Sequence, residues 1–333
     1  RDTDFSRHLV THFCSMTIRR NHDLSAAAIS TEKLLDKLSK SLDAAGLTYL
    51  KTRDVGAPIT PADLEAMRDP VPSTHPLGRK EELHIRSFVG QVAYTVLVRS
   101  PTSSLPLHCV ARNMHRPTTA VVRSCMNLIS FEYQHQDPLV FVGRHPDRVA
   151  TTPPEVHGFC DASHCNDTSL VNDDPAMHKA MSSYCGLIIF LCFNPSLWKC
   201  FLPRTVCPST RDSEYICAIK ATRDLIGFNI ILSELGFRSP TPPLLFTDSQ
   251  AAEKTAKSDH LHSDSRWMGI RIAWLRQCIK DLLVNIVWKS GKEQLADIMT
   301  KVLPAADYNT LRTLLMNLRY LELDGWAPAK LLK

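Results

Sequence analysis

The stretch EVHGFCD, from Glu155 to Asp161, has the length and apolar content of a buried β-strand that ends in a carboxylate. A second short apolar run, Leu244 to Thr247, is followed in the same way by Asp248. In α/β sheets, functional sites form at the carboxyl ends of the strands. If these two strands are neighbours, both carboxylates lie at one edge of the sheet.

The elements around these two runs alternate in type. Apolar runs predict further strands at 184–193, 197–206 and 284–288. Helical patterns cover 213–235, which Gly236 ends, and then 250–256, 265–283, 294–301 and 305–321. Because three strands precede the alternation, we expect an α/β fold whose mixed sheet starts antiparallel and carries helices on its faces.

Two more carboxylates stand at predicted helix starts. Glu214 lies in the first turn of the 213–235 helix, and Ala218 and Ala221 share its face. Small residues there would let the helix lie close to the sheet, so that Glu214 reaches over Asp161. Asp297 lies at the start of the 294–301 helix, although an acidic residue at a helix start is also a structural preference.

Four carboxylates in one place repel each other unless cations hold them. Oxygen ligands suit Mg²⁺ or Mn²⁺, and two such ions about 4 Å apart are the usual apparatus of in-line phosphodiester chemistry. Any one of the four, taken alone, is more typical of a solvated surface charge. Their positions at strand ends and helix starts favour a shared metal site.

The first half of the chain has a different pattern. The segment Phe13–Arg19 predicts a strand, and 26–30 predicts its hairpin return. An amphipathic helix begins after Thr31 and ends before Gly46. Prolines between 58 and 76 predict a loop, helical patterns run with breaks from 85 to 136, and 137–154 is a candidate linker. We therefore expect two domains, 1–150 and 151–333.

Composition sets limits on the class of protein. The net charge of +5 is compatible with a polyanionic partner, and no apolar run reaches membrane-spanning length. The eleven cysteines are odd in number and form no C-x-x-C pair, which favours a reducing compartment over a disulfide framework. A zinc site from Cys160, His164 and Cys165 is a weaker alternative. The first residue is not Met, so we expect a piece of a longer polypeptide.

Four motifs in order give a specific resemblance: GFCDAS at 158–163, STRDSEY at 209–215, TDSQA at 247–251 and EQLADIMTK at 293–301. Together they resemble the ribonuclease H domain of copia-type retrotransposon Pol polyproteins. Upstream, 13–19 resembles the last palm strand of the family's reverse transcriptase and 31–45 resembles its thumb. The segment 85–94 resembles the family's YRSLVGSLMYL stretch, and 112–132 resembles the helices that join thumb to ribonuclease H.

The resemblance implies a ribonuclease H-like mixed five-stranded sheet flanked by helices, preceded by a mainly helical thumb and connection region. It implies hydrolysis of the RNA strand of RNA–DNA hybrids, with two Mg²⁺ or Mn²⁺ ions and with Asp161, Glu214, Asp248 and Asp297 as catalytic and metal-binding residues. It also implies an upstream polymerase portion as partner, no membrane, and an intracellular location, in cytoplasmic virus-like particles or in the nucleus. Candidate nucleic-acid contacts are Ser249, Gln250, Arg266 and Arg271, although an ordinary solvated helix face would also explain the arginines.

Some positions depart from the family pattern. The polymerase's paired aspartates are absent from the matching region, so we expect no polymerisation by this chain alone. Trp267 and Gly269 replace a family histidine and aspartate, as in a diverged or decaying element copy. A catalytically silent module that binds a template–primer duplex or a partner chain is therefore the alternative. An integrase-like nuclease would carry a glutamate late in the sequence, whereas the late carboxylate here is Asp297.

Overall fold

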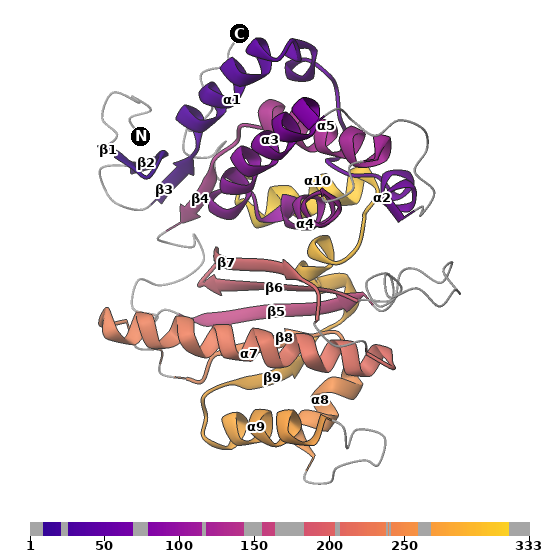
Figure 1. Ribbon diagram of the computed structural model, residues 1–333. Coiled ribbons are helices and arrows are strands. Elements are labelled where there is room, and N and C mark those ends of the chain that lie inside the picture. The colour runs from indigo at the N-terminus through magenta and orange to yellow at the C-terminus, as the bar shows by residue number, and fades with distance from the viewer. Residues whose placement is uncertain are drawn as a thin grey trace. The chain divides into compact units, whose positions relative to one another are not determined.

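The computed structural model describes residues 9–20, 26–68, 79–114, 118–142, 155–163, 183–203, 207–237, 239, 241–258 and 268–319. The chain divides into two compact units, one of Arg1–Arg148 with Val302–Lys333 and one of Val149–Lys301. Figure 1 labels their elements.

The second unit is built on a five-stranded mixed sheet, as predicted. In the order β7-β6-β5-β8-β9, its strands are β7 (Asn194–Phe201), β6 (Tyr184–Leu191), β5 (Val156–Ser163), β8 (Leu244–Thr247) and β9 (Asn285–Trp288). The pairs β5–β6 and β6–β7 are antiparallel, whereas β5–β8 and β8–β9 are parallel. The strand expected at 197–206 begins earlier, at Asn194, and ends at Phe201.

Three helices and the sheet enclose the core of this unit: α7 (Thr210–Glu234), α8 (Gln250–Lys257) and α9 (Gly269–Lys280). Ala218 and Ala221 are fully buried, so α7 lies close to β5 and β6 as their small size predicts. Cys217 lies between them in sequence, and its Sγ is 3.1 Å from the Asp161 carbonyl oxygen and 3.3 Å from that of Gly186. The sheet is therefore held tightly against α7 at the level of Asp161.

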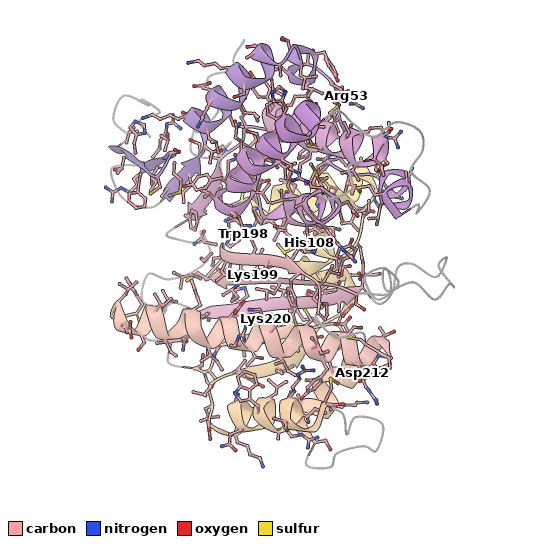
Figure 2. All side chains as sticks on the ribbon, in the orientation of Figure 1. Arg53, His108, Trp198, Lys199, Asp212 and Lys220 are labelled. Carbon is pink, nitrogen blue, oxygen red and sulfur yellow. The ribbon has the colours of Figure 1, made fainter. Side chains whose placement is uncertain are left out.

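Polar contacts also join α7 to β7. Asp224 of α7 accepts from Lys199 Nζ of β7 and from Lys220 Nζ of its own helix, each at 2.8 Å. Figure 2 labels both lysines and also Asp212, at the start of the helix. The Ser209 hydroxyl caps α7 by accepting from the Asp212 N–H at 3.2 Å.

Two short 3₁₀ helices follow β9: η5 (Gly291–Glu293) and η6 (Leu295–Met299). Cys185 and Leu187 point into the core beneath α7, so Gly186 between them faces the other side of the sheet. A Cβ on Gly186 would lie only 2.7 Å from Met299 Cβ and 2.9 Å from Thr300 Cγ2. The segment predicted as a helix at 294–301 forms the shorter 3₁₀ helix η6, which packs on this second face because Gly186 leaves room for it.

The first unit holds an antiparallel sheet in the order β1 (Leu9–Phe13), β2 (Met16–Arg20), β3 (Ala26–Ser30) and β4 (Leu139–Val142). The predicted hairpin return at 26–30 corresponds to β3. The strand predicted at 13–19 was wrong at its start, because Phe13 ends β1 and Cys14 and Ser15 form the turn into β2. The prediction of a continuous linker over 137–154 was wrong in its described part, because 139–142 pairs with β3.

The helices of the first unit are α1 (Glu32–Ala44), η2 (Thr48–Lys51), α2 (Pro61–Arg68), α3 (Arg79–Val98), η3 (Pro101–Ser103), α4 (Ser104–Asn113), α5 (Thr119–Gln134) and α10 (Ala305–Leu315). Gly46 follows α1 with a φ of +72°, as its predicted role in ending the helix requires. The loop expected between 58 and 76 was wrong over α2, which begins at Pro61, because proline suits the first helical position.

The C-terminal helix α10 belongs to the first unit, whereas the second domain was expected to run to residue 333. The Tyr308 hydroxyl donates to Thr102 Oγ1 at 3.2 Å, and Arg312 pairs with Asp137 at 2.5 Å. Nearby, Arg99 and Glu132 form a fully buried ion pair at 2.6 Å. These polar contacts hold the returning chain to the first unit.

In the part of the chain that the structure describes, no helix has both the length and the apolar surface to cross a membrane. The ten cysteines in the same part are all free thiols.

Candidate metal centre

The register of the sheet brings two of the predicted carboxylates together. Phe159 of β5 and Phe246 of β8 are parallel partners, and each stands two residues before a carboxylate, Asp161 and Asp248. Asp297 on η6 joins them from the second face of the sheet. One carboxylate oxygen from each of the three lies within 4.8 Å of the others. These three side chains form a group that could hold a metal ion.

Glu214 lies beside this group without being one of the three. It is 5% exposed and accepts a hydrogen bond from the Ala162 N–H, while its Oε2 has no hydrogen-bond partner. Burial, together with the nearby charges of Asp161, Cys217 and Asp248, raises the pKa of Glu214 to about 10. A buried carboxylate oxygen without a partner is what a bound cation would satisfy.

The pKa values of the Asp161 and Asp297 carboxyls are also raised. Burial is the main cause that raises the pKa of Asp161 to about 7, and Asp297 and Asp248 add to it. Burial also raises the pKa of Asp297. Oxygen-only donors that ionise reluctantly when left together fit a divalent cation such as Mg²⁺, since its charge would favour their ionised forms.

Two neighbours of Asp297 take part in this group, although the sequence motif did not single them out. Lys301 Nζ lies 2.9 Å from Asp297 Oδ1 and 3.7 Å from Asp161 Oδ2. The Thr300 hydroxyl donates to Asp161 Oδ2. Lys301 stands four residues after Asp297, which is the spacing of a helical ion pair and the signal that could have identified it.

The main chain around Asp161 is fixed by a further residue. The buried Gln294 side chain donates from Nε2 to the Cys160 carbonyl at 3.0 Å, and its Oε1 accepts from the Ala296 N–H at 3.3 Å. Gln294 thus joins β5 to the start of η6, and so sets the position of Asp297 relative to Asp161.

The four residues predicted to contact nucleic acid differ in their surroundings. Ser249 caps α8, because its hydroxyl accepts from the Ala252 N–H at 3.1 Å. Gln250 and Arg271 are exposed, and Arg266 lies outside the described residues. Of the alternative zinc ligands, His164 and Cys165 also lie outside them, and Cys160 is fully buried.

Several known proteins are similar to the chain in sequence. No family model matches the chain. The retrovirus-related Pol polyprotein from transposon TNT 1-94 of Nicotiana tabacum is 28% identical over 117 residues, or 35% of this chain. The corresponding polyprotein from transposon RE1 of Arabidopsis thaliana is 22% identical over 218 residues, or 66% of the chain. The chain is similar to copia-type retrotransposon Pol polyproteins. The resemblance expected from the four motifs is confirmed, and the matched stretches span 9% and 14% of these two polyproteins.

Two solved structures match parts of the chain at low identity. LC11-RNase H1, in complex with an RNA/DNA hybrid, matches 44% of the chain and 94% of its own length, with 12% identity and a TM-score of 0.31. A foamy viral protease-reverse transcriptase in complex with double-stranded DNA matches 84% of the chain and 38% of its own length, with 12% identity and a TM-score of 0.38.

Proposed function

We propose that the second unit hydrolyses the RNA strand of RNA–DNA hybrids in a reaction that depends on a divalent metal, as part of a retrotransposon reverse transcriptase. The observation that carries this proposal is the convergence of Asp161, Asp248 and Asp297 beside the buried, unpartnered Glu214 oxygen. The similarity to retrotransposon Pol polyproteins supports the choice of substrate. The remainder of the polyprotein, with its polymerase portion, would be the natural partner.

Each carboxylate has a role in this proposal. Asp161, near the carboxyl end of β5, and Asp248, directly after β8, would hold two Mg²⁺ or Mn²⁺ ions jointly. Asp297 would complete the site from η6, and Glu214 would complete it from α7 and orient the attacking water. When bound, such ions activate water and stabilise the departing oxygen of a phosphodiester.

The protein's own contribution is to hold the donors in position and to balance their charge. Gln294 and Thr300 fix Asp161 from the η6 side, and Cys217 fixes it from the α7 side. Lys301 supplies one positive charge to the two carboxylates nearest to it. The donors are thus placed before any cation is bound, which lowers the cost of ordering them.

The test is cleavage of a labelled RNA–DNA hybrid by the full chain with Mg²⁺, compared with Glu214→Gln and, as a control, with Glu253→Gln, which removes a carboxylate of α8 that pairs with Lys257. We expect hybrid-specific cleavage that Glu214→Gln reduces at least a hundredfold and Glu253→Gln leaves intact. No cleavage by folded protein, or cleavage that Glu214→Gln does not change, would refute the proposal.

A catalytically silent module that binds the hybrid is the second candidate, and one observation favours it. The Lys301 ammonium already lies at ion-pair distance from Asp297 and Asp161, where it neutralises part of the charge that attracts metal. Hybrid binding in a gel-shift assay, with no cleavage at any Mg²⁺ or Mn²⁺ concentration, would select this candidate.

A further inference from the structure

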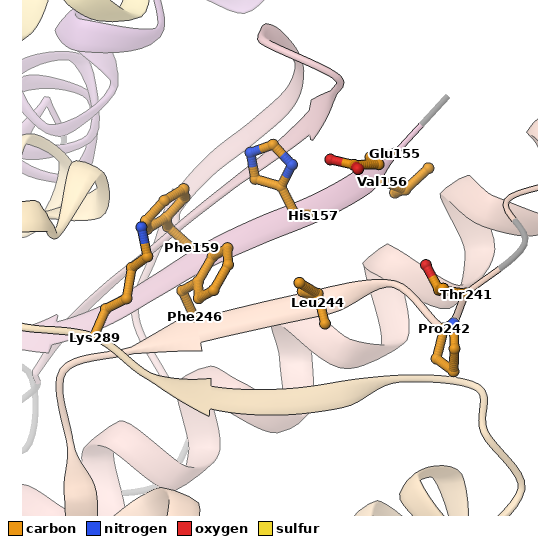
Figure 3. A pocket seen from close by; sticks show the side chains of 9 residues that line it. All are labelled: Glu155, Val156, His157, Phe159, Thr241, Pro242, Leu244, Phe246 and Lys289. Atoms are coloured by element: carbon orange, nitrogen blue, oxygen red, sulfur yellow. The ribbon is translucent and has the colours of Figure 1, made fainter. Parts of the chain in front are cut away.

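A separate pocket of about 290 Å³ opens on the sheet of the second unit (Figure 3). Its side chains come from β5, from β8 with the segment before it, and from the residue after β9. They are Glu155, Val156, His157, Phe159, Thr241, Pro242, Leu244, Phe246 and Lys289. None of these nine residues is one of the carboxylates of the candidate metal centre, although Phe159 and Phe246 stand two residues before Asp161 and Asp248 in the sequence.

The pocket lies on the same face of the sheet as the carboxylates. Side chains two residues apart on a strand point the same way, so Phe159 shares a face with Asp161, and Phe246 shares it with Asp248. Two residues along a strand correspond to about 7 Å. A polymer that passes the carboxylates along these strands would reach the pocket with its next unit.

The lining combines flat aromatic rings with a cation. The Phe159 and Phe246 ring centroids are 5.0 Å apart, and the His157 ring stacks on Phe190 with centroids 5.1 Å apart. Lys289 Nζ lies 4.7 Å from the Phe246 centroid and 5.6 Å from that of Phe159. Figure 3 shows Lys289 at one end of this row of rings and the Glu155 carboxylate toward the other.

This combination suits a ligand with a flat ring and a negative charge. Single-stranded nucleic acids bind through bases placed against aromatic side chains and phosphates placed near cations. The ion pair of Lys289 with Glu293 is long, at 3.7 Å, and Glu293 is largely exposed, so a phosphate could replace it at little cost. The volume lies at the lower end for ligand pockets and suits one nucleotide better than a base pair.

We propose that this pocket binds one unpaired nucleotide of a single-stranded nucleic-acid segment. The base lies against Phe246, Phe159 and His157, and the phosphate lies at Lys289. The proposal goes beyond hybrid hydrolysis, because binding here needs neither the metal nor the carboxylates. The second unit would then bind an unpaired strand beside the carboxylates of β5 and β8.

The experiment measures binding of a short fluorescent oligothymidylate to the full chain by anisotropy, with EDTA present so that no strand is cut. Phe246→Leu keeps the apolar volume but removes the ring, and Lys289→Gln removes the charge. Lys257→Gln, on an exposed lysine of α8, is the matched control for loss of one positive charge. Thermal melts followed by circular dichroism confirm that each variant is folded.

We expect Phe246→Leu to weaken binding roughly tenfold, the effect of losing one stacked base. Lys289→Gln should weaken binding and lower the slope of log affinity against log salt by about 0.7, the loss of one phosphate contact. Lys257→Gln should change neither value. If Phe246→Leu does not fold, Lys289→Gln and the salt slope carry the test.

Three results would overturn the proposal. In the first, both pocket variants bind the oligonucleotide as tightly as the wild type. In the second, Lys257→Gln weakens binding as much as Lys289→Gln, which would indicate general electrostatic attraction. In the third, the folded wild type binds no single-stranded oligonucleotide, which would indicate that the pocket accommodates a protein side chain instead. Hybrid cleavage assayed in parallel keeps the two proposals separate, since loss of cleavage with intact single-strand binding refutes only the hydrolysis.

Discussion

Replacing Glu214 by Gln should make the metal-free protein more stable, although it should abolish hybrid cleavage. The Glu214 carboxyl has an ordinary pKa of 4.5, which burial, with neighbouring negative charge, raises to about 10 in the folded protein. At pH 7 the folded protein therefore keeps this proton and the unfolded chain loses it. Because the folded state binds more protons, stability falls as the pH rises from 4.5 towards 10.

The size of the effect follows from the two pKa values. Between pH 4.5 and pH 7 the loss is about 2.5 pH units at about 1.4 kcal/mol each, or roughly 3 kcal/mol of unfolding free energy. Gln has nearly the same shape as protonated Glu and does not titrate, so Glu214→Gln removes this loss. The stability advantage of the variant should grow by about 1.4 kcal/mol for each pH unit above pH 5.

The assay is urea unfolding of both proteins in EDTA, at one pH near 5.5 and one near 7.5. Glu253→Gln is the matched control, because a hydrogen bond from Lys257 lowers the pKa of that carboxyl and the substitution should not stabilise the fold. An advantage for Glu214→Gln that is the same at both pH values, or a variant less stable than wild type at the higher one, would refute the reasoning. With excess Mg²⁺ the order should reverse, since only the wild type gains the full binding energy.

Other perturbations test the surroundings of the site. Gly186→Ala should cost about 1–3 kcal/mol of stability and displace Asp297, because its Cβ would meet Met299 and Thr300. Urea unfolding and cleavage rates measure these effects. The control is Gly227→Ala in the middle of α7, where a Cβ would meet no other atom, and it should raise the stability by about 0.5–1 kcal/mol. Lys301→Gln should tighten Mg²⁺ binding on the order of tenfold in isothermal titration calorimetry, because a competing positive charge is lost, and unchanged affinity would count against that role. Since burial raises the pKa of Glu214 to about 10 and that of Asp161 to about 7, Mg²⁺ binding should release a proton from Glu214 above pH 7 and a second proton from Asp161 below it, and each proton released should lower the affinity by up to tenfold per pH unit as the pH falls. Heats measured in two buffers of different ionisation enthalpy would reveal the released protons, and equal heats would exclude them.

The sequence predicted the parts of the site that depend on local order. The apolar runs before Asp161 and Asp248 correctly predicted two strands with a carboxylate near their carboxyl ends, although β5 continues past Asp161 to Ser163. The pairing of Phe159 with Phe246 then brings the two carboxylates together. The central sheet was predictable for the same reason. Its three leading strands and the later alternation leave few topologies open.

Contacts between distant segments could not be predicted in this way. Residues 139–142 looked like part of a linker, because nothing local shows that they pair with 26–29, more than a hundred residues earlier. The α10 segment was correctly predicted to be helical, but a helical pattern does not identify its partner. Only the structure shows that the Tyr308 hydroxyl donates a hydrogen bond to Thr102 and that α10 belongs to the first unit.

The position of Asp297 depends both on the local sequence and on contacts with distant segments. From local order alone it was the weakest of the four carboxylates, since acidic residues are common at helix starts. What brings it to Asp161 is a glycine in the middle of another strand, which lets η6 rest on the sheet, and a glutamine that bonds to the Cys160 carbonyl. Those contacts are made by neutral groups, and Lys301 and bound protons reduce the repulsion that remains. The carboxylates are therefore assembled by packing and hydrogen bonds, so that Gly186→Ala should disrupt the site even in protein that has never bound a metal.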